Sequence, residues 1–497
     1  MKGFRFTTTK NAIANLVRGC ATAAVAIALP RFLTRLLDVE HFAAWSLILQ
    51  ISAYASYLDF GLQTAIARFI AHAVELEQKE RQAKLVSTAL SLLSFAALIA
   101  FAVISIVIWQ FPRLFGGIPN GLLPEFRHAA LLLSLVACLL LPLSTYTGVL
   151  IGMNRNEIPA LAIGGSRIAG ALLAIVVGRY TQSLTVLALC IGAPNLLGGL
   201  LQMAAVHGII AEGKARLGHI SKAVGAELLR FCAGLTVWSF GSLLVSGLDV
   251  TIVGHYRFSA VGFYSIASVL IVFFAGLTNS ALGALLAPVA ALHAREEKDR
   301  ILRIFFAATR MTLLANLSLT AAIFLFGGPM LRLWVGPIYA EGSLPILKIL
   351  AIAQTFRLMV APYSVMLIST GEQNKAIPTV ICEALVNLVA SVFGMIMLGP
   401  VGVAWGTLAG AICGVLWIIL RTMPSVDTCR VAFGKLLANA ILPASIPCLP
   451  LAIIWLIRGH LKPPAETIGL GISVIATAAL GRWCFRHSFS RFGVRRI

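Results

Sequence analysis

Apolar stretches of about 20 residues follow one another along this chain, separated by short segments that carry most of the charged residues. A stretch of that length, wound as an α-helix, crosses the hydrocarbon core of a bilayer. The pattern predicts fourteen transmembrane helices, near residues 12–34, 42–66, 86–109, 128–150, 159–177, 184–205, 231–253, 261–290, 306–327, 344–368, 377–398, 403–421, 439–457 and 465–482. We therefore expect an all-α protein that spans a membrane many times.

The composition points to burial in lipid. The 497 residues are 59% hydrophobic and 12% charged, and the mean hydropathy is +0.92. Soluble domains are roughly half apolar and about a quarter charged. The connections between the apolar stretches are short, the longest outer one running over residues 110–127. They leave no room for a soluble catalytic domain, and we do not expect an enzyme.

Similar blocks of sequence recur at a constant spacing of 219 residues. FAAWS at 42–46 corresponds to VGFYS at 261–265, and KER at 79–81 corresponds to KDR at 298–300. Two equivalent halves are a common plan of secondary transporters, whose substrate path lies between the halves. The repeat assigns a six-helix N-terminal lobe to 1–219, a six-helix C-terminal lobe to 220–438, and two additional helices with a basic tail to 439–497.

The charge is strongly basic, with 39 Lys and Arg against 19 Asp and Glu and a net charge of +20. No compact basic domain is present to bind nucleic acid, so nucleic acid is not an expected partner. Most basic residues lie in connections on the side of both termini, and the positive-inside rule places that side in the cytoplasm. The basic C-terminal tail is expected to lie against anionic membrane lipids. The nine cysteines lie in predicted helices or on the inner side, which implies no disulfide framework.

Seven ionisable residues fall within the predicted helices. Such a residue costs at least about 2.5–3.5 kcal/mol at the bilayer centre on insertion scales, so each is expected to face the protein interior or a watery cavity. They are Arg18, Asp59, Arg167, Asp249, Lys348, Arg357 and Glu383.

Some of these residues lie at matching depths in the bilayer. Arg18 and Asp59 agree within about 2 Å at the rise of an α-helix, and Asp249 and Lys348 are similarly level near the outer face. Such pairs are either structural ion pairs between helices or titrating sites that couple transport to protons or sodium. Both interpretations stay open for Asp59, Asp249 and Glu383.

The basic members of the set outnumber the acidic ones. Arg167 and Glu383 lie about one helical turn apart once the repeat offset is applied, so the two halves carry opposite charges at comparable depth. Arginine binds phosphate bidentately and lysine binds it as a point charge. We expect Arg18, Arg167, Lys348 and Arg357 to line a central cavity that binds a substrate carrying a diphosphate. The alternative is that backbone carbonyls and neighbouring acids satisfy each basic group.

Two prolines and a row of glycines mark other features of the helices. Pro142 and Pro362 lie in equivalent helices of the two halves, one residue apart after the repeat offset, and are candidate hinges or simple kinks. Glycines recur every fourth residue over 402–414 and bare a backbone stripe for close packing, within the chain or with a second subunit.

The segment Tyr57-Leu58-Asp59-Phe60-Gly61-Leu62, after FAAW at 42–45 and before Ala67-Arg68, resembles the second-helix signature of O-antigen (Wzx-type) oligosaccharide flippases. These proteins belong to the multidrug/oligosaccharidyl-lipid/polysaccharide exporter superfamily. The resemblance implies a two-lobed, MATE-like transporter of a bacterial inner membrane that alternates between inward-open and outward-open states. Its cargo would be a polyprenyl-diphosphate-linked oligosaccharide for a surface polysaccharide such as O-antigen, capsule or exopolysaccharide, and other polysaccharide-assembly proteins would be its partners.

Three alternatives remain open at this stage. The lipid II flippases also carry two additional helices, and multidrug or cation antiporters belong to the same superfamily. A membrane glycosyltransferase or polymerase is a third alternative, although it needs catalytic acids and a sizeable outer loop.

The GxxxxGK match at 208–214 lacks the following Ser or Thr and trails a helix, so no nucleotide site is expected. No HExxH, CxxC or GxSxG motif is present, and we expect neither a cofactor nor a metal.

Overall fold

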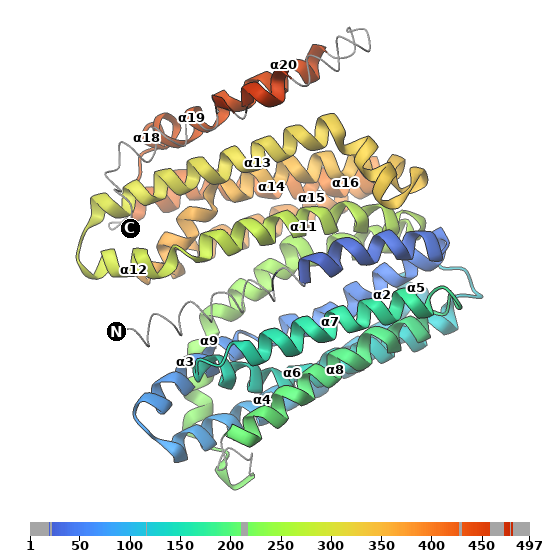
Figure 1. Ribbon diagram of the computed structural model, residues 1–497, viewed down its shortest axis with the longest axis vertical. Helices are drawn as coiled ribbons and strands as arrows, with labels where there is room; N and C mark the ends of the chain where they lie inside the picture. Colours follow the sequence, from blue (N-terminus) through green and yellow to red (C-terminus); the bar gives the residue numbers. More distant parts are fainter. Residues whose placement is uncertain are drawn as a thin grey trace. The chain divides into compact units, whose positions relative to one another are not determined.

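A computed structural model describes residues 19, 22–115, 117–209, 217–426, 430–457, 472–477 and 479–480. All regular elements in these residues are helices, as Figure 1 shows, so the expected all-α fold is confirmed. The chain divides into two compact units. Unit 1 comprises Met1–Leu243 and Val250–Ser265, and unit 2 comprises Leu244–Asp249 and Ile266–Ile497.

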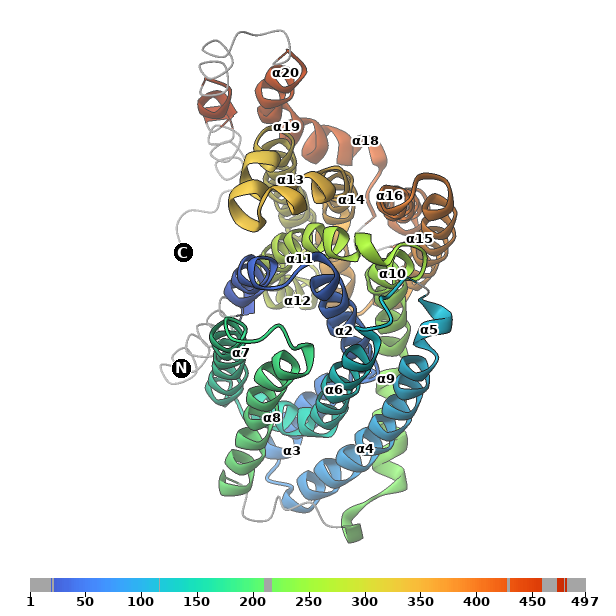
Figure 2. The ribbon, with the colours of Figure 1, turned by 90° about the vertical axis from the view of Figure 1, so that its right-hand side faces the viewer.

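Unit 1 is a bundle in which α7 packs on α8, α8 on α6, and α6 on α4 (Figure 2). Its core includes Ile66, Val86, Tyr146 and Leu228, which come from four different helices. Because Leu228 belongs to α9, this helix is anchored in the core of unit 1. The helices are α2 (Val39–Tyr57), α3 (Leu62–Glu75), α4 (Lys79–Trp109), α5 (Phe111–Leu114), α6 (Leu123–Gly152), α7 (Glu157–Val177), α8 (Leu184–Ile209) and α9 (Lys222–Ser242).

The chain leaves unit 1 in a π-helical turn, Leu243–Gly247, returns to it over Val250–Ser265, which includes most of α10 (Asp249–Tyr256), and enters unit 2 again at Ile266. Unit 2 then has a core built around Phe305 and Tyr363, whose rings meet edge to face at 5.6 Å. Its helices are α11 (Val261–Gly283), α12 (Leu286–Ala294), α13 (Lys298–Val335), α14 (Pro337–Thr370), α15 (Ile377–Leu398), α16 (Pro400–Trp417), α17 (Met423–Ser425), α18 (Phe433–Leu436), α19 (Leu442–Ser445) and α20 (Leu449–Ile457).

Among the described residues, ten helical segments are long and apolar enough to cross a membrane. They coincide with ten of the fourteen predicted spans, so the count of fourteen is not confirmed. The other four predictions concern two spans that run into residues outside the described ranges, and two that the structure divides. The divided spans are 42–66, which becomes α2 and α3, and 231–253, which contains the π-helical turn.

Each of the two units contains an interrupted helix. The first break separates α2 from α3 at Leu58–Gly61, where Phe60 and Gly61 have φ of 50° and 77°. This left-handed backbone cannot continue an α-helix, and a bulky residue such as Phe60 rarely adopts it. The second break separates α11 from α12 at residues 284–285, a few residues beyond the repeat-equivalent position.

The glycine stripe of α16 packs against α15 of the same chain. An added Cβ at Gly402, Gly406 or Gly410 would collide with atoms of Gly394, Ser391 and Asn387, respectively. The absence of side chains therefore lets the two helices approach closely. Gly399, with φ of 67° and ψ of −150°, forms the one-residue connection between them.

Candidate functional site

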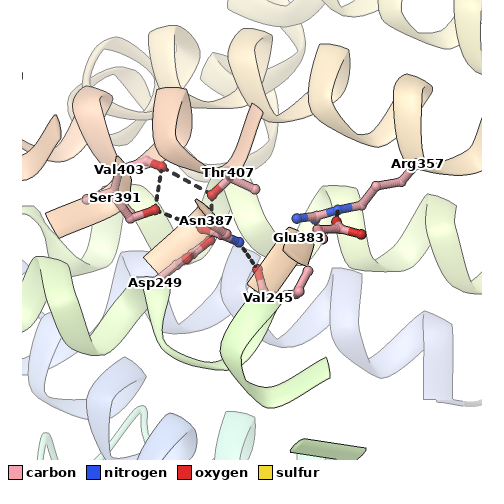
Figure 3. A network of polar contacts seen from close by, with 8 residues as sticks. All are labelled: Val245, Asp249, Arg357, Glu383, Asn387, Ser391, Val403 and Thr407. Carbon is pink, nitrogen blue, oxygen red and sulfur yellow. Dashed lines mark hydrogen bonds and ion pairs between the residues drawn. The ribbon is translucent and has the colours of Figure 1, made fainter. Parts of the chain in front are cut away.

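Two predicted site residues form an ion pair inside unit 2. Arg357 of α14 donates through Nε to Glu383 Oε1 of α15 at 2.6 Å, and the two side chains are only 19% and 17% exposed (Figure 3). Gly414 makes room for the carboxylate, since a Cβ there would lie 2.8 Å from Glu383 Oε2. The Nη2 atom of Arg357 is buried and has no hydrogen-bond partner among the described residues. The guanidinium is therefore partly neutralised but retains a donor for a further acceptor.

A second polar cluster surrounds Asp249 at the start of α10. The side chain is 6% exposed, and Thr407 Oγ1 of α16 lies 3.0 Å from its Oδ2 (Figure 3). The same hydroxyl lies 3.1 Å from the carbonyl oxygen of Val403. Ser391 Oγ is 2.8 Å from Asn387 Oδ1 and 3.3 Å from that carbonyl. A carboxylate, two hydroxyls, an amide and a backbone carbonyl thus meet between the π-helical turn, α15 and α16.

The Asn387 amide connects this cluster to the interrupted part of the seventh predicted span. Its Nδ2 donates to the carbonyl oxygen of Val245, within the π-helical turn Leu243–Gly247. A π-helical turn leaves backbone groups out of the regular i to i−4 ladder, and such groups need other partners. The side chain of Asn387 therefore holds the turn in place beside Asp249.

The remaining predicted residues lie in other surroundings. Asp59 sits at the break between α2 and α3, where Ser144 Oγ lies 3.4 Å from Oδ1 and the Gln63 N–H lies 3.5 Å from Oδ2. Arg167 of α7 is exposed and donates through Nη1 to Thr22 Oγ1 at 2.8 Å. Arg18 lies outside the described residues, so its pairing with Asp59 stays a prediction.

Lys348 and Asp249 have different described contacts. Lys348 Nζ lies 5.4 Å from the centre of the Phe324 ring, whereas the described bond of Asp249 joins it to Thr407. Lys348 and Arg357 lie on α14 nine positions apart, which is about 13 Å along a helix. Both belong to unit 2 and Arg167 belongs to unit 1.

The candidate hinges lie in unbroken helices. Pro142 falls inside α6 and Pro362 inside α14. Each proline removes one backbone donor from its helix, which locally weakens the hydrogen-bond ladder. Their role as hinges stays a prediction.

No group of three or more His, Cys, Asp or Glu side chains in the described ranges is arranged to hold a metal ion. The cluster around Asp249 is instead rich in neutral oxygen atoms, the ligands that hard cations prefer. The charge of Asp249 identified it in the sequence, whereas Asn387, Ser391 and Thr407 were not predicted. Their spacing is the available signal, because residues 387 and 391 lie one turn apart and face the glycine stripe.

The chain is also similar to proteins of known family and fold. A model of the family described as "Polysaccharide biosynthesis protein" matches residues 8–292. No curated protein sequence matches the chain.

Several solved structures are similar over most of their length. The lipid II flippase MurJ, in an inward closed conformation, has a TM-score of 0.73 at 14% identity, covering 96% of this chain and 99% of its own. A multidrug resistance MATE family transporter of the MOP superfamily, facing inward, has a TM-score of 0.66 at 17% identity, covering 82% and 98%. A MOP superfamily transporter from Pyrococcus furiosus has a TM-score of 0.54 at 17% identity, covering 84% and 96%. These likenesses confirm the transporter fold that the sequence predicted.

Proposed function

The chain belongs to the polysaccharide biosynthesis protein family, and we propose that it flips a polyprenyl-diphosphate-linked oligosaccharide across a membrane by alternating access. The observation that carries the proposal is the family match over more than half of the chain. The fold shared with a lipid II flippase and a MATE transporter supports a carrier that works without a catalytic domain. We infer that the protein moves its cargo unchanged and is not an enzyme.

The diphosphate is proposed to bind to the basic residues within the helices, Arg18, Arg167, Lys348 and Arg357. Arg357 has the best support, because its buried Nη2 has no acceptor among the described residues. An unmet buried donor costs about 1–3 kcal/mol, and a phosphate oxygen would relieve that cost. Glu383 fixes the other edge of the same guanidinium at 2.6 Å and holds it ready for the ligand.

The acidic residues Asp59, Asp249 and Glu383 are proposed to couple transport to a cation gradient or to serve as structural partners. Asp249 has the strongest claim to coupling, since its carboxylate is 6% exposed and lies in a cluster of oxygen atoms beside a π-helical turn. Protonation or a bound sodium ion would remove the cost of a buried negative charge there. Alternating access itself is symmetric, so the gradient or downstream enzymes choose the net direction.

We propose the bacterial inner membrane as the location, with both termini in the cytoplasm. The basic residues concentrated in the connections on one side support this orientation. Enzymes that assemble the surface polysaccharide are the proposed partners, because the cargo has to be built before it is flipped and used afterwards.

The deciding experiment is deletion of the gene in its native host, followed by mass spectrometry of polyprenyl-diphosphate oligosaccharides and of the finished surface polysaccharide. Accumulation of complete repeat units with loss of surface glycan is the expected result. Normal amounts of both would refute the proposal. Complementation with Arg357→Gln should fail or be weak, whereas Arg332→Gln should complement, because Arg332 is 64% exposed and its described ion pair is with the exposed Glu341.

Two other functions have specific support. The fold likeness to MurJ favours a lipid II flippase, and accumulation of lipid II with arrested cell-wall growth would identify that function. The fold likeness to MATE transporters favours a cation antiporter, and increased sensitivity to organic cations with normal lipid-linked intermediates would identify it.

A further inference from the structure

Two adjoining pockets lie in unit 1 where α4 and α9 begin. The larger, of 580 Å³, is lined by Lys79, Arg81 and Lys84 of α4 together with Glu227 of α9. The smaller, of 390 Å³, is lined by residues of α3 and α9 and shares Glu227 with the first. We call these two cavities together the α4–α9 pocket. None of the residues assigned to the transport site above lines it.

The larger pocket has an excess of positive charge. Arg81 Nη2 binds both carboxylate oxygens of Glu227, at 3.0 and 3.3 Å, and this pair ties α4 to α9. Lys84 pairs with Glu80 at 2.6 Å, but Glu80 is 79% exposed. Exposed ion pairs of this kind contribute little, so an incoming anion displaces them at low cost. With Lys79, three basic side chains and two carboxylates line this pocket.

The smaller pocket combines an apolar surface with further cations. The rings of Phe69 and Phe231 meet edge to face at 5.8 Å, and the Arg68 guanidinium lies 5.1 Å from the centre of the Phe231 ring. Arg230 also lines this pocket and is exposed. A surface of two aromatic rings edged by two guanidinium groups suits a molecule that carries a phosphate next to a hydrocarbon chain.

We propose that the α4–α9 pocket binds one anionic phospholipid, with the headgroup phosphate among Lys79, Arg81 and Lys84 and an acyl chain against Phe69 and Phe231. The pocket lies at the end of α4, a helix able to span a membrane, so it falls at the level of the lipid headgroups. Anionic lipids are concentrated in the cytoplasmic leaflet, and each basic residue near the surface strengthens their binding. The proposed topology puts the pocket in that leaflet.

Binding there would act on the helix that leads out of unit 1. The Arg81–Glu227 pair and the buried Leu228 hold α9 on α4 and α3, and α9 runs directly into the π-helical turn where the chain passes to unit 2. A lipid phosphate that bridges Arg81 and Lys79 would add to this attachment. The bonds described for Arg81 use Nη2 alone, which leaves its other N–H groups for the phosphate.

The test measures lipid binding by native mass spectrometry of the full chain purified in detergent. Phosphatidylglycerol is compared with phosphatidylcholine of identical acyl chains. The double variant Lys79→Gln/Arg230→Gln removes two pocket charges and keeps the Arg81–Glu227 pair. The control, Arg300→Gln/Arg303→Gln, removes two charges at the start of α13, where Arg300 pairs with Glu297 of the preceding turn at 2.7 Å.

The wild type and the control are expected to prefer phosphatidylglycerol by about tenfold or more, and the pocket variant to lose most of that preference. Lys79→Arg/Arg230→Lys should restore it, which separates loss of charge from loss of fold. Equal binding of both lipids by the wild type, or equal preference in the pocket variant and the control, would overturn the proposal.

Two competition arms separate the sources of the phosphate. Displacement of the lipid by millimolar inorganic phosphate would show a simple anion site and overturn the assignment to a phospholipid. Displacement by polyprenyl diphosphate at lower concentration than phosphatidylglycerol would assign the pocket to the transported lipid instead. The leaflet assignment rests on the proposed function, but the assay measures binding rather than transport, so failure of the phospholipid proposal can be distinguished from failure of the proposed function.

Discussion

The close packing of α15 and α16 can be tested by adding a single methyl group. In the variant Gly410→Ala, the new Cβ would lie 2.7 Å from Asn387 Cβ and 3.0 Å from the carbonyl oxygen of Glu383. Carbon atoms in contact are normally separated by about 3.5–4.0 Å, so the helices have to move apart by roughly 0.8 Å or more. Neither neighbouring atom is at the end of a flexible side chain, and rotamer changes cannot relieve the collision.

Two opposing effects set the size of the change in stability. Replacing glycine by alanine inside a helix is favourable by up to about 1 kcal/mol. Overpacking a closely packed interface costs about 1–3 kcal/mol, and occasionally more. The collision dominates, so we expect Gly410→Ala to destabilise unit 2 by about 1–2 kcal/mol. The separation would also move Asn387 away from the carbonyl of Val245.

The assay is thermal unfolding of the detergent-purified protein, and the growing reactivity of its buried cysteines reports the unfolding. The matched control is Gly328→Ala in α13, where an added Cβ would lie 3.6 Å from Leu344 Cδ2, an ordinary contact. We expect Gly328→Ala to melt at or slightly above the wild-type temperature and Gly410→Ala clearly below it. A melting temperature of Gly410→Ala equal to that of Gly328→Ala would refute the close packing of α15 against α16.

Three further variants test local features of the fold. Glu383→Ala leaves the Arg357 guanidinium without its partner and should cost about 3–5 kcal/mol, and a double-mutant cycle with Arg357→Ala that proves additive would show that the pair does not interact. Asp38→Ala removes the side chain that accepts the His41 N–H at 2.7 Å and should lower the thermal stability by about 0.5–2 kcal/mol, whereas Asp38→Asn should retain most of it. Burial raises the pKa of Asp38, but the hydrogen bonds from His41 outweigh this effect and leave the pKa below its usual value. The ionised Asp38 therefore stabilises the folded protein at pH values above the usual pKa of Asp. This stabilisation is lost as the pH falls through the lowered pKa. Gly399→Ala forces a side chain into a backbone conformation that only glycine adopts readily, and unchanged thermal unfolding would contradict the expected loss of about 1–3 kcal/mol.

Hydropathy predicted the positions of most helices because nearly every residue of a membrane-spanning helix is apolar. It did not predict the break between α2 and α3. The stretch 42–66 is mostly apolar apart from a few polar residues and Asp59, and the interruption depends on the positive φ of Phe60 and Gly61, which hydrophobicity does not report. The glycine at position 61 was a local signal, since glycine adopts this conformation readily.

The sequence predicted the charged residues of the candidate site but not their partners or the neutral polar residues around them. The sequence predicted that Glu383 lies at the same depth as Arg167. In the structure, helix packing instead pairs Glu383 with Arg357, whose Nε lies 2.6 Å from Glu383 Oε1. Depth along one helix says nothing about which neighbour a side chain faces, and a single sequence does not contain that information. The partner of Asp249 was missed for a different reason, because Thr407 is uncharged and unremarkable among other apolar and small residues.

The one-residue connection at Gly399 also bears on how this protein enters the bilayer during synthesis. With only Gly399 between α15 and α16, the two helices emerge from the ribosome in immediate succession, so we expect them to leave the translocon together. Alone, α15 would expose Glu383, Asn387 and Ser391 to lipid, at a cost of a few kcal/mol for the carboxylate alone. Paired, the helices cover much of this polar surface with the glycine stripe of α16. We therefore predict that the hairpin inserts into the membrane as one unit.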